Sequence, residues 1–262
     1  MLLLLDIGNT HTHVAVAADR RRLVRPVNLP TAAWRAGQML DLISRHLHRA
    51  TVTKVALCSV VPGATAIAVK ALARSWNLKP FQLNDKSVRG IGIDYPKPAT
   101  IGPDRLANAA AARAEFGAPV VVVDFGTAVT FDVVTRAGNY AGGIIAPGLA
   151  VMTTYLHEKT ALLPQIRIRE VSGAFGKSTE NAMLIGAVHG YRGLIRELIH
   201  GLRRELKCRH LPVVATGGYA ELMAKELPEI TAVEPLLTLK GLRLAWDLHQ
   251  SEAINSAVPS PG

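Results

Sequence analysis

Two segments of this chain repeat one pattern 118 residues apart, and the repeat limits the folds that the chain can adopt. Residues 2–17 read LLLLDIGNTHTHVAVA, and residues 121–134 read VVVDFGTAVTFDVV. In each segment an apolar run ends in Asp, a hydrophobic residue and Gly follow, and a second apolar stretch begins. Apolar runs of this length, broken at a Gly, predict two strands joined by a tight hairpin. Two copies of the hairpin favour a duplicated domain.

The Asp and Gly of each hairpin suit the binding of a phosphorylated ligand. Gly allows backbone conformations in which amide N–H groups point into the turn and hold an anion. Asp6 and Asp124, at the strand ends, can each hold Mg²⁺ through water beside that anion. The alternative is that each carboxylate caps its own turn. The presence of both copies favours a nucleotide phosphate tail bound between the two halves.

The rest of the chain alternates between strand-like and helix-like patterns. The expected strands cover residues 23–28, 54–61, 80–83, 144–148 and 212–218, and the expected helices cover residues 31–49, 64–77, 104–116, 178–206 and 239–250. Such alternation predicts a two-domain α/β protein. We expect the domains at residues 1–117 and 118–262, with the last helix able to pack back across the boundary.

Composition places the chain among compact cytoplasmic proteins. Its 262 residues are 49% hydrophobic, which is ample for a core, and no run approaches the roughly 18–20 apolar residues that span a bilayer. Residues 1–5 lack the basic start and the cleavage site of a signal peptide, so we expect a buried strand there. Cys58 and Cys208 have no metal-ligand spacing and fit buried thiols in a reducing cytosol.

The net charge of +10 is the unusual feature of the composition. It could indicate a nucleic-acid partner or an anionic substrate such as ATP. The Lys and Arg residues are scattered along the chain, however, and only three Trp and five Phe are present. Nucleic-acid surfaces more often combine a basic stripe with stacking aromatic rings. The pattern therefore favours a solvated basic surface.

Six motifs occur in a fixed order along the chain. They are DIGNT at 6–10, GPDR at 102–105, DFGT at 124–127, YAGGIIAPGL at 140–149, GKSTENAMLIG at 176–186 and TGG at 216–218. The ordered set resembles the motif series of the type III pantothenate kinases, also called the Bvg accessory factor family, from residue 2 to about residue 246. The resemblance implies an actin-like ATPase fold, with two RNase-H-like domains flanking a nucleotide cleft. It also implies ATP-dependent phosphorylation of pantothenate to 4′-phosphopantothenate, the first step of coenzyme A biosynthesis.

The resemblance assigns roles to both hairpin turns. The residues it places at the ATP phosphates are Asp6, Ile7, Gly8, Asn9 and Thr10 in the first turn, and Gly126 and Thr127 in the second. Asp6 would hold Mg²⁺ through water. Asp124 would contribute to a site for a monovalent cation, K⁺ or NH₄⁺.

The GPDR motif supplies the expected catalytic base, Asp104. Its position at the start of a helix also suits an ordinary first-turn residue that interacts with the helix dipole. The resemblance implies that Asp104 accepts the proton of the substrate hydroxyl. Gly102, Pro103 and Arg105 would lie beside the substrate, although Pro103 stands where a small residue is more usual. Tyr95 would line the pantothenate pocket; the alternative is a ring packed on the surface.

The GKST segment does not form a phosphate-binding P-loop, because Val171 stands where that motif requires Gly. The resemblance instead implies that Thr179 reaches the substrate pocket of the other subunit of a homodimer. Ser178 replaces the usual Asn before it. Gly186, Gly190 and Gly193 then share one face of a helix, which we expect to be the dimer interface; the competing account is a close contact with a helix of the same chain.

Two other functions remain open from the residues themselves. One is a non-catalytic actin-like ATP-binding regulator of transcription, which Asp6, Asp104 and Asp124 together argue against. The other is a kinase of a different small alcohol. His11 and His13 share a strand face and could bind a metal, but no third His or Cys lies near them in the sequence.

Overall fold

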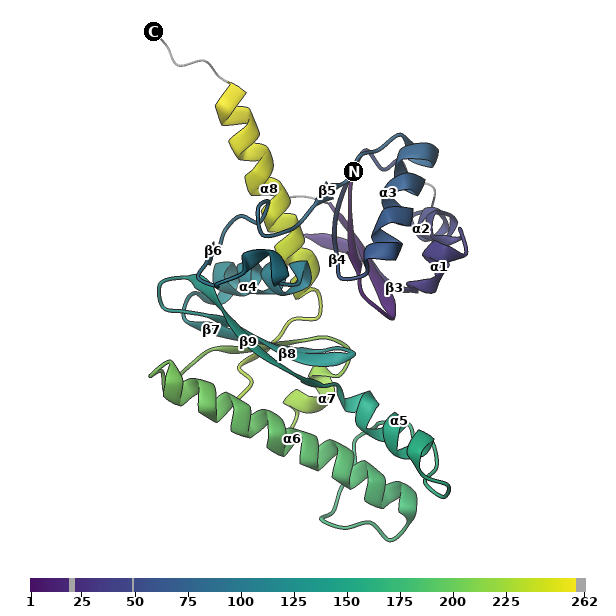
Figure 1. The fold of residues 1–262 in the computed structure, drawn as a ribbon, viewed down its shortest axis with the longest axis vertical. Coiled ribbons are helices and arrows are strands. Elements are labelled where there is room, and N and C mark those ends of the chain that lie inside the picture. Colours follow the sequence, from purple (N-terminus) through teal and green to yellow (C-terminus); the bar gives the residue numbers. More distant parts are fainter. Residues whose placement is uncertain (19–21, 49, 258–262) are drawn as a thin grey trace. The chain divides into compact units, whose positions relative to one another are not determined.

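The computed structural model describes residues 1–18, 22–48 and 50–257, and its contacts divide the chain into two compact units (Figure 1). Unit 1 comprises Met1–Glu115 and Leu236–Gly262, and unit 2 comprises Phe116–Pro235. The chain passes from unit 1 to unit 2 after Glu115, close to the expected boundary after residue 117. The C-terminal segment differs from the expected division, because from Leu236 onward the chain belongs to the first unit.

Unit 1 is built on a five-stranded sheet in the order β3-β2-β1-β4-β5. The strands are β1 (Leu2–Ile7), β2 (His11–Ala17), β3 (Leu23–Pro30), β4 (Lys54–Ser59) and β5 (Phe81–Gln82). The β1–β2 pair is the antiparallel hairpin that the sequence predicts. The β4 strand runs parallel to β1, with Cys58 directly opposite Asp6. The two side chains therefore point to the same face of the sheet.

Helices cover both faces of this sheet. Successive residues of β1 point to opposite faces, and nearly all of them are therefore buried. Leu3, Leu5 and Ile7 belong to a core with residues of α1 (Ala32–Arg35), α2 (Met39–His46) and α3 (Pro62–Trp76). The single helix expected over residues 31–49 is thus two helices, since Gly37 between them has a φ of +68°; residue 49 lies outside the described residues.

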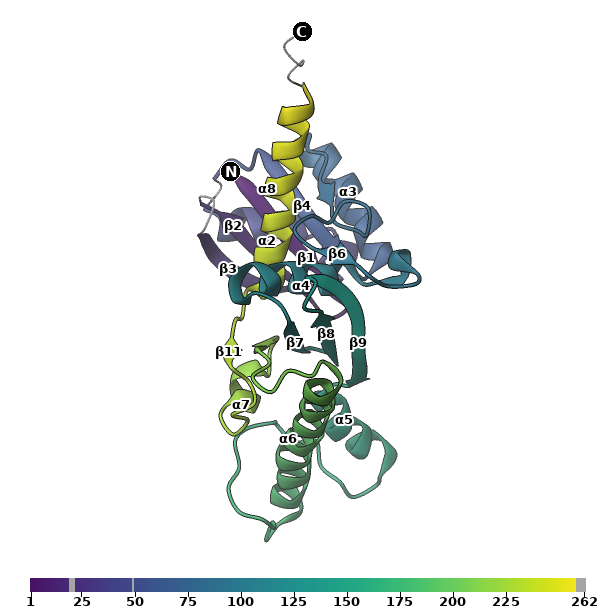
Figure 2. The ribbon, with the colours of Figure 1, turned by 90° about the vertical axis from the view of Figure 1, so that its left-hand side faces the viewer.

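The α8 helix (Leu237–Ala257) contacts β1, β2 and β4 of the same sheet (Figure 2). It also packs tightly on α4 (Pro103–Phe116), because a Cβ atom at Gly241 would overlap the backbone of Ala107. Thr238 Oγ1 donates a hydrogen bond of 2.7 Å to Asn108 Oδ1. These contacts explain why the end of the chain belongs to unit 1. The strand β6 (Gly92–Ile93) and the short 3₁₀ helix η1 (Pro98–Thr100) precede α4.

Unit 2 repeats the arrangement of unit 1. Its strands are β7 (Val120–Phe125), β8 (Ala128–Val134), β9 (Asn139–Pro147), β10 (Val213–Thr216) and β11 (Ala232–Val233), which lie in the order β11-β10-β7-β8-β9. The β7–β8 hairpin is antiparallel, and β10 runs parallel to β7 with Thr216 opposite Asp124. The duplicated hairpin is therefore confirmed, and each hairpin lies inside a sheet of the same strand order.

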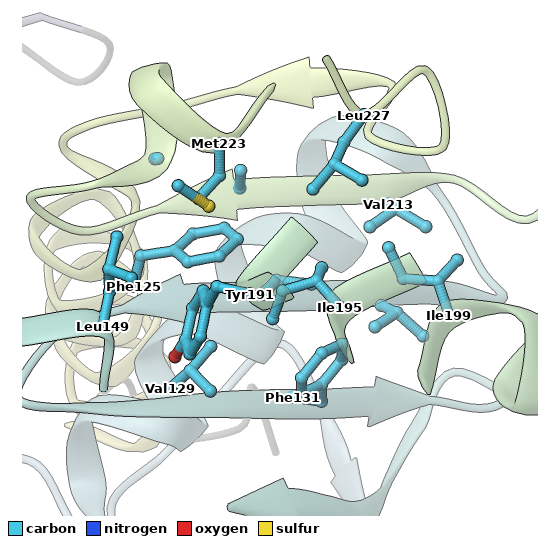
Figure 3. Packing of buried hydrophobic residues seen from close by; sticks show 14 of the residues in the cluster. Phe125, Val129, Phe131, Leu149, Tyr191, Ile195, Ile199, Val213, Met223 and Leu227 are labelled. Carbon is cyan, nitrogen blue, oxygen red and sulfur yellow. The ribbon is translucent and has the colours of Figure 1, made fainter. Parts of the chain in front are cut away.

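The helices of unit 2 are α5 (Leu149–Lys159), α6 (Thr179–Glu205) and α7 (Ala220–Ala224). One face of α6 packs its apolar side chains against the sheet, among them Tyr191, Ile195 and Ile199 (Figure 3). The Tyr191 hydroxyl donates to Pro147 O at 2.8 Å, and burial raises the pKa of Tyr191 to about 12. Among the described residues, no helix is long and apolar enough to cross a membrane.

Candidate active site

The first turn is closed by its own backbone. Gly8 N–H donates to His11 O at 2.9 Å, and a Cβ atom at residue 8 would lie only 3.0 Å from that same oxygen. Thr31 Oγ1 donates to Gly8 O at 2.7 Å and fixes the turn from outside. Asn9 and Thr10 are exposed at its tip. The turn is therefore rigid at its base and open to a ligand at its tip.

Asp104 lies in the first turn of α4, as the sequence predicts. The N–H groups of Arg105 and Leu106 donate to Gly102 O, so the helix begins directly after Gly102. Asp104 Oδ1 accepts the N–H of Arg105 at 2.8 Å. Burial raises the pKa of Asp104, while the backbone N–H and the guanidinium of Arg105 act in the opposite direction. The carboxyl group thus accepts a local bond, as a first-turn residue does, yet it is also largely removed from water.

Cys58 connects this carboxylate to Asp6. The Cys58 thiol is fully buried and donates to Asp6 Oδ1 at 3.4 Å. Burial raises the pKa of the Cys58 thiol well above its usual range, and the charges of Asp6 and Asp104 raise it further. Two carboxylates from distant parts of the sequence therefore lie near one thiol. Our sequence reasoning treated Cys58 only as a buried thiol; its place on a strand parallel to β1 was the available signal.

Two glycines from other segments approach the second turn closely. Gly217 follows β10 with a φ of +89°, and a Cβ atom there would lie 2.5 Å from Asp124 Oδ1 and 2.7 Å from the backbone of Phe125. Gly148 is just as close to the second turn, because its Cβ atom would overlap the carbonyl oxygens of Gly126 and Thr127. Sequence reasoning quoted both glycines inside motifs but assigned neither of them a role.

The two turns fit the ligands that the resemblance implies. Asp6 and Asp104 offer carboxylate oxygens of the kind that Mg²⁺ prefers. In the second turn, Asp124 Oδ1 lies beside Gly217, and the carbonyl oxygens of Gly126 and Thr127 lie beside Gly148. A side chain at either glycine would occupy the space next to these oxygen atoms. Oxygen ligands of this kind suit a hard monovalent cation, and exposed Gly126 and Thr127 suit a phosphate.

The remaining expected site residues are placed less directly. Tyr95 is 38% exposed in the segment between β6 and η1, so its role at the substrate stays a prediction. Thr179 is the exposed first residue of α6. Ser178, whose role the sequence left open, caps that helix by accepting the N–H of Asn181 at 3.2 Å.

The glycine face of α6 points away from the core of unit 2. Gly186, Gly190 and Gly193 are exposed, and a Cβ atom at any of them would meet no atom within 4 Å. No other helix of unit 2 therefore packs closely on this face. Within unit 2 nothing supports the competing account of a close contact with a helix of the same chain, and the dimer interface stays a prediction.

The two histidines of β2 do not point to a metal. The rings of His11 and His13 lie 6.5 Å apart, and His13 Nδ1 is 2.7 Å from Asn28 Oδ1. Across the part of the chain that the structure describes, no group of three or more His, Cys, Asp and Glu side chains could hold a metal ion by itself.

Comparisons with known proteins agree on one family. The family model described as "Type III pantothenate kinase" matches residues 2–201. The type III pantothenate kinase of Akkermansia muciniphila is 45% identical over 248 residues, which cover 94% of this chain and 98% of that protein. The one from Methylacidiphilum infernorum is 41% identical over 249 residues, which cover 94% and 88%.

Two solved structures show the fold. A conserved putative Baf family transcriptional activator from Campylobacter jejuni is 19% identical with a TM-score of 0.61, and covers 95% of this chain and 99% of its own. The activator of 2-hydroxyisocaproyl-CoA dehydratase from Clostridium difficile, with bound ADPNP, is 14% identical with a TM-score of 0.53, and covers 99% of each chain. Both support an actin-like ATPase fold of two duplicated domains.

Proposed function

Because the chain belongs to the type III pantothenate kinase family, which phosphorylates pantothenate with ATP in coenzyme A biosynthesis, we propose that Asp104 is its catalytic base. The observation that carries this assignment is the burial of the Asp104 carboxyl group at the start of α4, where its charge acts on the Cys58 thiol that donates to Asp6. It brings the expected base and the expected Mg²⁺ residue into one neighbourhood. A raised pKa makes the Asp104 carboxylate a stronger proton acceptor than an exposed Asp.

The reaction then needs little covalent chemistry from the protein. Asp104 accepts the proton of the pantothenate hydroxyl as the hydroxyl oxygen bonds to the γ-phosphorus of ATP, the bond from that phosphorus to the β,γ-bridging oxygen breaks, and ADP leaves. Phosphoryl transfer depends chiefly on positioning and on neutralising the phosphate charge. Asn9 and Thr10 in the first turn and Thr127 in the second bind the phosphate tail, while the N–H groups of Gly8 and Gly126 donate within their own turns.

Cations complete the neutralisation. Asp6 would hold Mg²⁺ through water, and Asp124 would contribute to a site for K⁺ or NH₄⁺. When bound, these ions supply positive charge beside the phosphates. We expect activity in K⁺ to be far above that in Na⁺ or Tris buffer, measured by a coupled assay at fixed ionic strength; equal rates in all three would remove the monovalent site.

A second subunit completes the substrate pocket. One subunit contacts pantothenate through Tyr95, Gly102, Pro103 and Arg105. The other contacts it through Thr179 of the partner subunit. The outward glycine face of α6 supports a homodimer, because glycines let a partner helix approach closely. Exposed apolar side chains on α5 and on the segment before α6 add a surface suited to a protein partner. They are Val151, Met152, Tyr155, Leu156, Leu162 and Phe175.

The experiment that tests this proposal compares two aspartate variants. Purified protein is assayed with ATP, Mg²⁺, K⁺ and pantothenate, first as wild type and then as Asp104→Asn. Asp94→Asn is the matched control, because Asp94 is an exposed loop residue of the same unit. Turnover that collapses only in Asp104→Asn supports the base. Turnover retained in Asp104→Asn would assign Asp104 to the helix start alone.

A further inference from the structure

The end of α6 carries an open cavity of about 500 Å³ whose lining is rich in cationic side chains. It is lined by His200, Arg203, Arg204, Lys207, Cys208 and Arg209. Four of these residues carry a full positive charge, and none of the six is acidic. All belong to unit 2, whose sequence is close to neutral, with 12 Lys and Arg residues against 11 Asp and Glu residues. The cavity therefore gathers four positive charges in a unit whose net charge is close to zero.

The cations of the cavity are weakly neutralised by the protein. Among the described residues, Lys207 and Arg209 form no ion pair, and Arg204 pairs only with the exposed Glu197, at 3.2 Å. Arg203 Nη2 donates to the backbone carbonyl of Glu229, so this guanidinium is held by the protein. Lys207 and Arg209 are exposed and are the cations best placed to meet an anion from solvent.

The helix dipole accounts for only part of this charge. Cations in the last turn of a helix are favourable, and Arg203 and Arg204 occupy that turn. The effect is confined to the last turn, and α6 ends at Glu205. Lys207 and Arg209 lie beyond the end of the helix, so they need another explanation.

Lys207 holds an unfavourable backbone conformation. Its φ is +47°, and the N–H groups of Lys207 and Cys208 donate to the carbonyls of Arg204 and Arg203, the pattern that closes a helix at a left-handed residue. Gly is the usual residue at this position, because a Cβ atom is disfavoured there. Lys207 therefore places a cation at the edge of the cavity in a backbone conformation that glycine would adopt more easily.

We propose that this cavity binds a small phosphorylated anion, with Lys207 and Arg209 as its principal cationic contacts. A phosphate group carries two charges and several acceptor oxygens, which matches clustered Arg and Lys donors. The cavity lining contains no Trp, Tyr or Phe ring on which a base could stack, so a small phosphorylated ligand fits better than a nucleic-acid strand.

Cys208 provides a reporter inside the cavity. Its thiol is partly exposed, whereas Cys58 is fully buried and serves as the internal control. The full-length protein is treated with iodoacetamide while pyrophosphate is raised at constant ionic strength, and alkylation at each cysteine is followed by mass spectrometry. We expect saturable protection of Cys208 by pyrophosphate, beyond any effect of chloride at the same ionic strength.

Variants locate the effect. Lys207→Gly and Arg209→Gln should each raise the half-protecting pyrophosphate concentration about tenfold, as expected for the loss of one charge-assisted hydrogen bond. Arg136→Gln, an exposed cation of the same unit outside the cavity, should leave it unchanged. The Lys207→Gly variant should melt no lower than wild type, because glycine readily adopts the positive φ of residue 207. If it melts lower, the protection measured with Arg209→Gln is used to test the proposal.

Three results would overturn the proposal. They are protection that does not saturate, protection that is equal in both cavity variants and wild type, and protection by single-stranded DNA more than about a hundredfold better than pyrophosphate at equal phosphate concentration. The third result would indicate a nucleic-acid surface instead, because many phosphates on one strand engage scattered cations together.

Discussion

The two units contain the same strand–Asp–Gly–strand turn, yet they surround it with different material. In unit 1 the Asp6 carboxylate is next to side chains, the Cys58 thiol and the charge of Asp104. In unit 2 the Asp124 carboxylate lies against Gly217, where a Cβ atom would be only 2.5 Å from Asp124 Oδ1. The turn is thus the same in both units, but the strand beside it supplies a thiol to the aspartate in unit 1 and a glycine in unit 2.

The two units also differ in net charge. Unit 2 carries 12 of the 30 Lys and Arg residues and 11 of the 20 Asp and Glu residues, so its net charge is +1 and unit 1 carries the remaining +9. A cationic unit attracts anionic substrates over long distances. The overall charge of +10, which the sequence shows as scattered, thus belongs almost entirely to the unit that holds the expected base.

The largest expected effect is on turnover, in Asp104→Asn. Loss of a general base lowers turnover by ~10²–10⁴-fold. Because burial raises the pKa of Asp104 in the folded protein, the charged carboxylate reduces stability at pH 7. The variant should therefore melt at or above the wild-type temperature at pH 7. Calorimetry and a coupled kinase assay measure the two quantities on the same sample.

The pH dependence checks the sign of that effect. Below its folded pKa the wild-type Asp104 takes up a proton, so the stability advantage of Asp104→Asn should shrink as the pH falls through that value. Over the same range the wild-type turnover should fall with the loss of the base. A variant that melts lower than wild type at every pH would show that Asp104 stabilises the helix start instead.

The second prediction exchanges one feature between the units. Gly217 and Ser59 hold equivalent positions, each being the residue after the one that pairs with the turn aspartate. Gly217→Ser should reduce kcat/KM for ATP by about 10²-fold, because its Cβ atom would displace Asp124, and small displacements near a reacting group have effects of that size. Ser59→Gly should change kcat/KM far less. If the two substitutions reduce kcat/KM equally in steady-state kinetics, the proposed difference between the two turns is wrong.

The third prediction concerns the surface that only unit 2 has. Gly190→Leu should shift the protein toward monomer in light scattering and reduce pantothenate phosphorylation at least about tenfold, because in a two-fold dimer the leucine meets its own copy. Gly190→Ala is the matched control. It should stabilise α6 by about 0.5–1 kcal/mol, since nothing lies within 4 Å of its Cβ position. A fully active Gly190→Leu dimer would place the interface elsewhere.

The smallest expected effect is at Cys58. Cys58→Ala removes the weak donor to Asp6 and should weaken Mg²⁺-dependent activity by up to about tenfold, as for a typical hydrogen bond. Cys58→Ser keeps a donor and should restore most of the loss. The readout is the Mg²⁺ concentration at half-maximal rate. If alanine and serine behave alike, the thiol only fills space.

Sequence reasoning succeeded where a local pattern decides the structure. Both hairpins and the long helix α6 follow from apolar runs, a Gly turn and a helical repeat, and all three are present. It predicted no helix at α5, because the apolar residues there follow no single face and several remain exposed. The roles of Cys58 and Gly217 escaped it for another reason. Each depends on which strand lies beside a turn, and that pairing is set by the whole sheet.

The contact between Gly241 and Ala107 has a consequence for how the protein is made. During synthesis the stretch Phe116–Pro235 emerges complete, so unit 2 can fold while the end of the chain is still missing. The helix that carries Asp104 receives its partner α8 only after all of unit 2 has been synthesised, because α8 follows unit 2 in the chain. A nascent chain that stops before Leu236 therefore contains a complete unit 2 and a unit 1 that still lacks one of its helices.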